Sequence, residues 1–231
     1  MWTLLFDIDG TLLSTKGSGM IAISRAMKEL FDVDEIPKLT VHGRTDQGII
    51  EDLFAPFDID VSANIQAFKE LYWKYLPDTL HQREGFVLPG VFEVLDQLWE
   101  QDDVAMGIIT GNTERSAQQK LEHFGLRKYF HFGGYGDHHR DRNEVAREAL
   151  VSARAFLGER FDPERLWMMG DTANDVRCAR AIESKVIVVE TGGGSSDELV
   201  GSNPDLQVEN LADPEPVWRA IFGDNKKLPN G

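Results

Sequence analysis

Two aspartates, Asp7 and Asp9, are separated by a single residue where an apolar run near the start of the sequence ends, and Gly10 follows them. Two carboxylates this close do not readily stay ionised together unless a cation joins them or one is protonated. The pair therefore suits either a metal site or a nucleophile beside an acid-base group. A helix cap followed by a turn at Gly10 is the alternative for this segment alone.

A second polar segment, Thr110-Gly-Asn112, also follows an apolar run. A threonine hydroxyl and the free N–H groups at the start of a helix suit a phosphate oxygen, although the same residues are common in plain turns. In a third segment, Asp171 and Asp175 are four residues apart and share a face if that turn is helical. Hard oxygen ligands of this kind favour Mg²⁺. An N-cap aspartate with a solvated partner is the alternative.

Short apolar runs that alternate with amphipathic stretches must position these residues. The runs predict buried strands at 3–8, 104–109, 166–169 and 186–189, with weaker candidates at 129–132 and 206–209. Helical periodicity appears over 91–99, 117–124 and 145–157. This alternation predicts an α/β fold, a doubly wound, Rossmann-like parallel sheet whose ligands bind beyond the carboxyl ends of the strands.

One region, about 14–84, breaks the alternation, because it is rich in helical pattern without a convincing buried strand. We expect a small α-helical domain over 15–86, inserted into a core domain formed by 1–14 and 87–223. A flexible tail is expected over 224–231.

The composition excludes several classes of protein. With 24 Lys and Arg against 39 Asp and Glu, the formal net charge is −15, which disfavours nucleic acid as a partner. No stretch approaches the roughly 20 apolar residues of a membrane helix. The one cysteine, Cys178, excludes an intrachain disulfide framework. We expect a cytoplasmic protein that binds neither membranes nor nucleic acid.

In their order and layout, the three polar segments resemble the motifs of the haloacid dehalogenase-like (HAD) hydrolase superfamily: DxDGT at 7–11, the threonine motif at 110, and GDxxxD at 170–175. The resemblance covers nearly the whole chain. It is strongest to the branch of phosphoglycolate phosphatase and beta-phosphoglucomutase, in which a helical cap of the C1 type lies between the first two motifs.

The resemblance implies a role for each motif residue. Asp7 would be the nucleophile that forms an aspartyl-phosphate, and Asp9 would protonate the leaving alkoxide and later deprotonate water. The cofactor would be Mg²⁺, held by Asp7, the backbone carbonyl of Asp9, Asp171 and, directly or through a neighbour, Asp175. The residues implied to bind the transferring phosphoryl group are Thr110, Gly111 and Asn112.

The resemblance also implies a lysine between the second and third motifs that neutralises the nucleophile and the phosphate. No lysine stands just before the expected helix at 145–157. Arg142 is the candidate catalytic cation, since arginine can hold phosphate through two hydrogen bonds. Arg140, Lys120 and Lys128 are the alternative cations. If Arg142 has no catalytic role, we expect it to pair with a neighbouring acid on the surface. In the cap segment 41–46, Arg44 could contact a substrate anion; a helix N-cap at Thr45 with a solvated arginine is the alternative.

We therefore expect a Mg²⁺-dependent phosphatase that hydrolyses a phosphate monoester of a small metabolite. A phosphosugar mutase of the beta-phosphoglucomutase type uses the same chemistry and is the nearest alternative, and a catalytically silent binding protein on the same fold is another. The sequence leaves the particular ester and the oligomeric state open.

Overall fold

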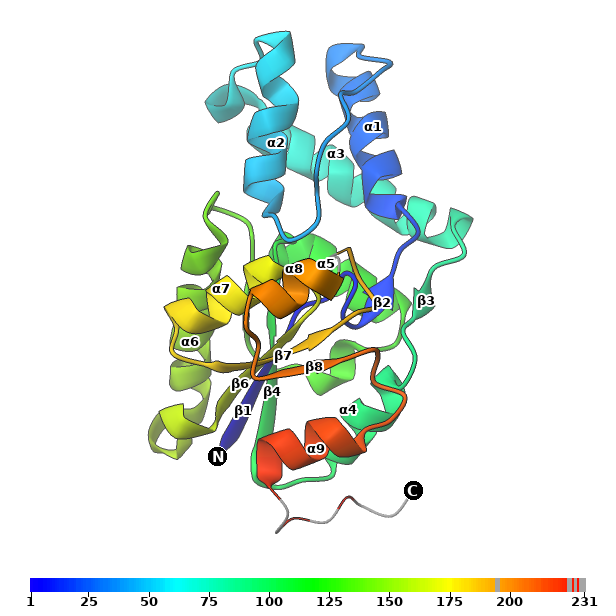
Figure 1. Cartoon of the computed structure of the whole chain (residues 1–231). Coiled ribbons are helices and arrows are strands. Elements are labelled where there is room, and N and C mark those ends of the chain that lie inside the picture. The colour runs from blue at the N-terminus through cyan, green and yellow to red at the C-terminus, as the bar shows by residue number, and fades with distance from the viewer. Residues whose placement is uncertain (194–195, 224–225, 227, 229–231) are drawn as a thin grey trace.

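The protein is described by a computed structural model over residues 1–193, 196–223, 226 and 228. At its centre lies a sheet in the order β5-β4-β1-β6-β7-β8, in which every neighbouring pair is parallel. The strands are β1 (Trp2–Phe6), β4 (Val104–Ile109), β5 (Gly133–Gly134), β6 (Leu166–Gly170), β7 (Lys185–Val189) and β8 (Leu206–Val208). Helices cover both faces of the sheet (Figure 1), so the predicted doubly wound α/β fold is confirmed.

Successive residues of a strand enter two different buried clusters, one on each face of the sheet. On one face, Leu4 and Phe6 join a cluster with α4 (Val91–Trp99), α5 (Glu114–His123) and α9 (Glu215–Phe222). On the other, Leu5 joins a cluster with α6 (Arg142–Leu157), α7 (Ala173–Ala181) and α8 (Ser196–Gly201). Burial on both faces is the reason that these strands are almost continuously apolar.

The weaker strand expected at 129–132 is wrong. A 3₁₀ turn occupies Arg127–Tyr129, the Phe130 ring packs 5.7 Å from that of Phe6, and the edge strand is only Gly133–Gly134. A Cβ at Gly134 would overlap the backbone of α6, so the close approach of this helix requires glycine at the edge. Further 3₁₀ turns lie at Ala55–Phe57, Gly158–Arg160 and Pro163–Arg165.

The segment between β2 and β3, the short strands at 13–14 and 86–87, forms three α-helices at the carboxyl end of the sheet (Figure 1): α1 (Ser18–Phe31), α2 (Asp46–Phe54) and α3 (Val61–Gln82). They enclose their own hydrophobic cluster, in which the rings of Phe31 and Phe68 each lie against Phe54. Because this cluster is separate from the two clusters of the sheet, we refer to α1, α2 and α3 with their connecting loops as the cap.

The chain leaves and re-enters the core through a short antiparallel pair, β2 (Leu13–Ser14) and β3 (Phe86–Val87). We propose that the domain boundaries lie at this pair, which divides the chain into 1–14 and 87–223 around 15–86. Most of the expected flexible tail, 224–231, lies outside the described residues. Within it, the Lys226 carbonyl accepts a hydrogen bond from the Trp218 indole.

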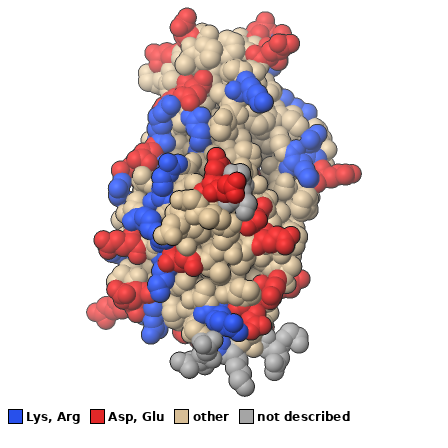
Figure 2. Space-filling view, in the orientation of Figure 1, with Lys and Arg blue, Asp and Glu red and all other residues tan. Residues whose placement is uncertain are grey.

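The described helices include none that is long and apolar enough to span a membrane. On the face shown in Figure 2, Lys and Arg side chains are interspersed with Asp and Glu. Despite the net charge of −15, that face is therefore not uniformly acidic.

Candidate active site

The three polar segments follow three strands that are neighbours in the sheet. Asp7 follows β1, Thr110 follows β4 and Asp171 follows β6, and the order β4-β1-β6 places all three at one edge. The Asp7 N–H donates to the Met169 carbonyl oxygen at 2.9 Å, which continues the ladder by one residue. The sheet thus brings Asp7 together with Thr110 and Asp171, each of which is more than 100 residues from it in sequence.

A buried carboxylate cluster forms at this edge from Asp7, Asp171 and Asp175, with one oxygen of each lying within 4.8 Å of the others. Burial raises the pKa of Asp7 to about 6 and that of Asp171 to about 8, and the charge of Asp175 adds to both shifts. A divalent cation would relieve this mutual repulsion, and hard oxygen donors are those that Mg²⁺ prefers. The residues therefore fit a magnesium ion.

Asp175 differs from its two neighbours because the protein uses both of its oxygens. Oδ1 accepts from Arg142 at 2.6 Å, while Oδ2 accepts from the backbone of Asp171 and from the N–H and hydroxyl of Thr172. With Thr172 it forms a capping box at the start of α7. These contacts suit a carboxylate that orients the Asp171 loop and Arg142.

Of the four candidate cations, Arg142 is the one that contacts the carboxylate cluster. Its Nη2 lies 3.0 Å from Asp7 and 2.6 Å from Asp175, and the residue is buried at the start of α6. Arg140 instead pairs with Glu51 and Asp52 on the cap, and Lys128 lies over the Tyr129 ring.

Lys120 is a second buried cation, and it pairs with Asp9. Its Nζ lies 2.6 Å from both the Asp9 carboxylate and the Asn112 side-chain oxygen. Burial opposes ionisation of Asp9, but the charge and hydrogen bond of Lys120 and the hydrogen bond from Asn112 hold the Asp9 pKa below its usual value. The spacing offered a signal for this contact, because Lys120 follows the Thr113 N-cap by seven residues, two helical turns.

Thr110 and Asn112 are joined within the second segment. The Thr110 hydroxyl oxygen accepts hydrogen bonds from the backbone and the side-chain amide of Asn112, and Thr110 is fully buried. The Asn112 amide also donates to Asp9 at 2.7 Å. This arrangement links the expected phosphate-binding residues to the expected acid-base residue.

Gly111 is the point where this segment contacts the cap. Its carbonyl oxygen accepts from the Asp46 N–H at 2.6 Å, and a Cβ at Gly111 would overlap the Arg44 carbonyl oxygen. Arg44 itself lines the cavity, but its guanidinium pairs with Asp52 at 2.6 Å. Thr45 caps α2, accepting from the Gly48 N–H.

Replacing Gly111 with alanine is expected to lower kcat/KM by about 10- to 100-fold, because the added methyl group displaces the cap loop from the site. Steady-state kinetics of the Gly111→Ala variant measure this. Gly201→Ala is the matched control, since a Cβ there meets nothing within 4 Å. Equal activity of the two variants would show that the cap contact at Gly111 does not matter for turnover.

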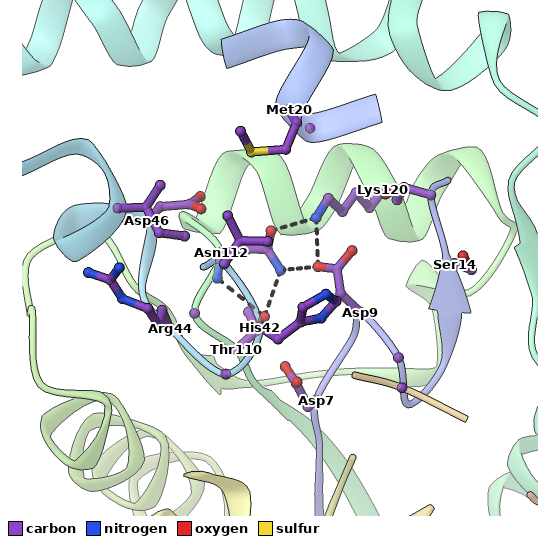
Figure 3. A pocket seen from close by; sticks show the side chains of 18 of the residues that line it. Asp7, Asp9, Ser14, Met20, His42, Arg44, Asp46, Thr110, Asn112 and Lys120 are labelled. Carbon is purple, nitrogen blue, oxygen red and sulfur yellow. Dashed lines mark hydrogen bonds and ion pairs between the residues drawn. The ribbon is translucent and has the colours of Figure 1, made fainter. Parts of the chain in front are cut away.

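A cavity of about 490 Å³ lies between the carboxyl edge of the sheet and the cap. In Figure 3, Asp7 lies at its base, Asp9 with Lys120 on one side, Asp46 on the other and Met20 above. The cavity therefore places the carboxylates and Thr110 of the core opposite side chains of the cap.

The glycines after β7 also contact the site. The Gly193 N–H donates to the Asp171 carboxylate at 3.0 Å, and a Cβ at Gly192 would overlap that carboxylate. Cys178, in contrast, is a buried free thiol, and His139 pairs with Glu148.

The sheet order, the acidic carboxyl edge and the helical cap define a doubly wound α/β protein with a ligand cavity at the strand ends. A model of the haloacid dehalogenase-like hydrolase family matches residues 4–189. The chain belongs to this family and is a hydrolase.

Named relatives cover most of the chain. A phosphoglycolate phosphatase from Agrobacterium fabrum is 27% identical over 90% of this chain and 88% of its own length. Among solved structures, CbbY from Rhodobacter sphaeroides, in complex with phosphate, has a TM-score of 0.70 at 16% identity, covering 92% of this chain and 96% of its own. A Thermotoga maritima protein provisionally named beta-phosphoglucomutase has a TM-score of 0.64 at 18% identity, covering 96% and 100%. At such identities, the solved structures show a shared fold.

Proposed function

We propose that this hydrolase is a Mg²⁺-dependent phosphatase that cleaves a small phosphate monoester through an aspartyl-phosphate intermediate. The observation that carries the proposal is the position of Asp7, which lies among buried carboxylates, against Arg142 and at the base of the cavity. The name of the Agrobacterium fabrum relative supports the same reaction class.

In the first step, an Asp7 carboxylate oxygen attacks phosphorus while the bond to the leaving oxygen breaks, and Asp9 gives that oxygen a proton. In the second step, Asp9 takes a proton from water, whose oxygen attacks phosphorus and releases phosphate from Asp7. The ion pair with Lys120 favours ionised Asp9, the form that this second step needs.

The remaining residues would position the phosphoryl group and neutralise its negative charge. Thr110 and the Asn112 N–H would bind the phosphoryl oxygens, and Arg142 would compensate negative charge beside Asp7. Bound Mg²⁺ would be held by Asp7, the Asp9 carbonyl and Asp171, with Asp175 supporting them, and would neutralise charge on the transferring group.

A phosphosugar mutase is the second candidate, because it uses the same core chemistry but returns the phosphoryl group to a sugar. The fold shared with the Thermotoga maritima protein is compatible with either reaction. A silent binding protein is disfavoured, since the chain is a hydrolase by family and carries Asp7, Asp9 and Asp171 together. We place the reaction in the cytoplasm, on a phosphorylated metabolite.

A panel of metabolite phosphates, including phosphoglycolate and glucose 1-phosphate, tests this assignment. We expect free phosphate from one or a few esters with Mg²⁺ present, and a decrease of at least about 100-fold in rate with EDTA, since a catalytic metal contributes several kcal/mol. Readdition of Mg²⁺ is the control. Turnover that is indifferent to EDTA would contradict the metal, and an isomeric sugar phosphate seen by phosphorus NMR would identify a mutase.

A further inference from the structure

The wall of the cavity opposite Asp7 comes from the cap and includes an apolar part. Met20 and Ile23 of α1, Ile49 of α2 and Tyr72 of α3 line it. Three of these residues, Ile23, Ile49 and Tyr72, are buried. A leaving group that occupies this half of the cavity therefore meets hydrocarbon and aromatic surface beside the polar side chains of the loop at 42–46.

Asp46, at the start of α2, interrupts this apolar part of the wall with a carboxylate. In Figure 3 its carboxyl group points toward Asn112. Oδ2 accepts from the Thr113 N–H at 2.8 Å and from the Ser116 hydroxyl at 3.3 Å, so its hydrogen-bonding partners are neutral. Among the described residues, no ion pair includes Asp46.

The ionised form of Asp46 lies in a poorly compensated environment. Burial raises the pKa of Asp46 to about 6, and the charge of Asp9 acts in the same direction, against the lowering effects of Lys120 and of the Thr113 N–H. A hydrogen-bond donor or a cation on a ligand would stabilise this carboxylate, whereas another carboxylate would add to the repulsion.

The cations that line the cavity are already engaged. Arg142 pairs with Asp7 and Asp175, and Lys120 pairs with Asp9. Arg44 pairs with Asp52, and the exposed Lys16 lies 5.0 Å from the centroid of the Phe86 ring. To pair with one of these lysines or arginines, a second anion on the substrate would therefore have to displace a carboxylate from its partner or draw Lys16 away from this ring. The His42 ring is a further basic side chain of the cavity lining.

We propose that Asp46 selects phosphate monoesters whose leaving group is neutral or cationic, offers a hydroxyl or ammonium donor, and carries no second anionic group. This inference rests on the proposed phosphatase function and adds the substrate class. The donor on the leaving group would hydrogen-bond to Asp46, and a carboxylate in its place would lie between the negative charges of Asp9 and Asp46.

Pairs of esters that differ in one charge measure this selectivity. Glycerol 3-phosphate is compared with 3-phosphoglycerate, and 2-hydroxyethyl phosphate with phosphoglycolate, each pair exchanging a hydroxymethyl group for a carboxylate. We expect kcat/KM for the neutral member to be at least about tenfold higher. p-Nitrophenyl phosphate is included because it reports phosphatase activity without offering a hydroxyl or ammonium donor to Asp46.

Asp46→Asn is the decisive variant, because its side-chain oxygen can still accept from Thr113 while the charge is removed. We expect the neutral-to-carboxylate ratio of kcat/KM to fall about tenfold in this variant. The ratio compares two esters in one protein, so a change in folding or in general catalysis cancels. Asp58→Asn removes an exposed cap charge at a left-handed position that asparagine tolerates, and it should leave the ratio unchanged.

The outcomes separate this inference from the proposed function. Hydrolysis of p-nitrophenyl phosphate together with an equal or greater rate for the carboxylate esters would overturn the role of Asp46 and leave the phosphatase in place. A preference for the neutral esters that survives unchanged in Asp46→Asn would likewise overturn it. No Mg²⁺-dependent hydrolysis of any ester would overturn the proposed function, and this inference with it.

Discussion

The Asp7→Asn variant is expected to lose at least about 10⁴-fold in kcat, because the amide cannot attack phosphorus and no aspartyl-phosphate can form. Asparagine has nearly the same shape as aspartate, and its side-chain oxygen can still accept from Arg142. The rate of phosphate release from the best ester in the presence of Mg²⁺ measures the loss. Turnover near that of the parent protein would exclude Asp7 as the nucleophile.

Thermal unfolding of the same variant, with EDTA present, provides the control for folding. The native state raises the Asp7 pKa from 3.8 to about 6, so it binds this proton more tightly than the unfolded chain. The Asp7 carboxyl therefore lowers the stability of the metal-free protein as pH rises through that range. At pH 7 we expect the Tm of Asp7→Asn to equal or exceed that of the parent.

Removing Arg142 is expected to have the second-largest effect, on stability as well as on catalysis. Its guanidinium separates two buried carboxylates, Asp7 and Asp175. In the metal-free protein, Arg142→Ala is expected to lower the free energy of unfolding by about 3–5 kcal/mol, the usual consequence of leaving a buried charge without its partner. We also expect kcat/KM to fall by about 10²- to 10³-fold with Mg²⁺ present, since charge beside the transferring group is lost.

Urea unfolding and steady-state kinetics test both parts, with two matched variants. Arg142→Lys retains the charge but not the planar group, so it should recover part of each loss. Arg147→Ala removes an arginine of the same helix that pairs with Glu144 at the surface, and its effect on stability should stay within about 1 kcal/mol. Equal stability of Arg142→Ala and Arg147→Ala would contradict the importance of the buried pair.

The main elements of the fold follow from local patterns in the sequence. The runs at 3–8, 104–109 and 166–169 are apolar enough to require burial on both faces, and a polar residue of the candidate site lies within two residues of each end. Parallel strands share a carboxyl edge, so the convergence of Asp7, Thr110 and Asp171 could be predicted without coordinates. The strand predicted at 129–132 was wrong, because aromatic residues that pack beneath a sheet edge have the same composition as a strand.

The choice among the cations depended on tertiary structure. Arg140 and Arg142 are two residues apart in one polar segment, and composition does not separate them. The start of α6 turns Arg142 inward toward Asp7, whereas Arg140 precedes that helix and meets the cap acids. Lys120 reaches Asp9 because α5 begins directly after the Thr110 segment and runs beneath the cap.

The sequence by itself determined the α/β class, the helical insertion and the carboxylates at the strand ends, because burial and strand polarity are local properties of a chain. Only the tertiary structure decided which cations neutralise those carboxylates and that Asp46 enters the cavity. These contacts join segments such as 46 with 113 and 9 with 120. The first contact forms only when the cap packs on the core, and the second only when α5 packs beside the end of β1 within the core. The pattern of one segment does not specify which distant segment will pack against it.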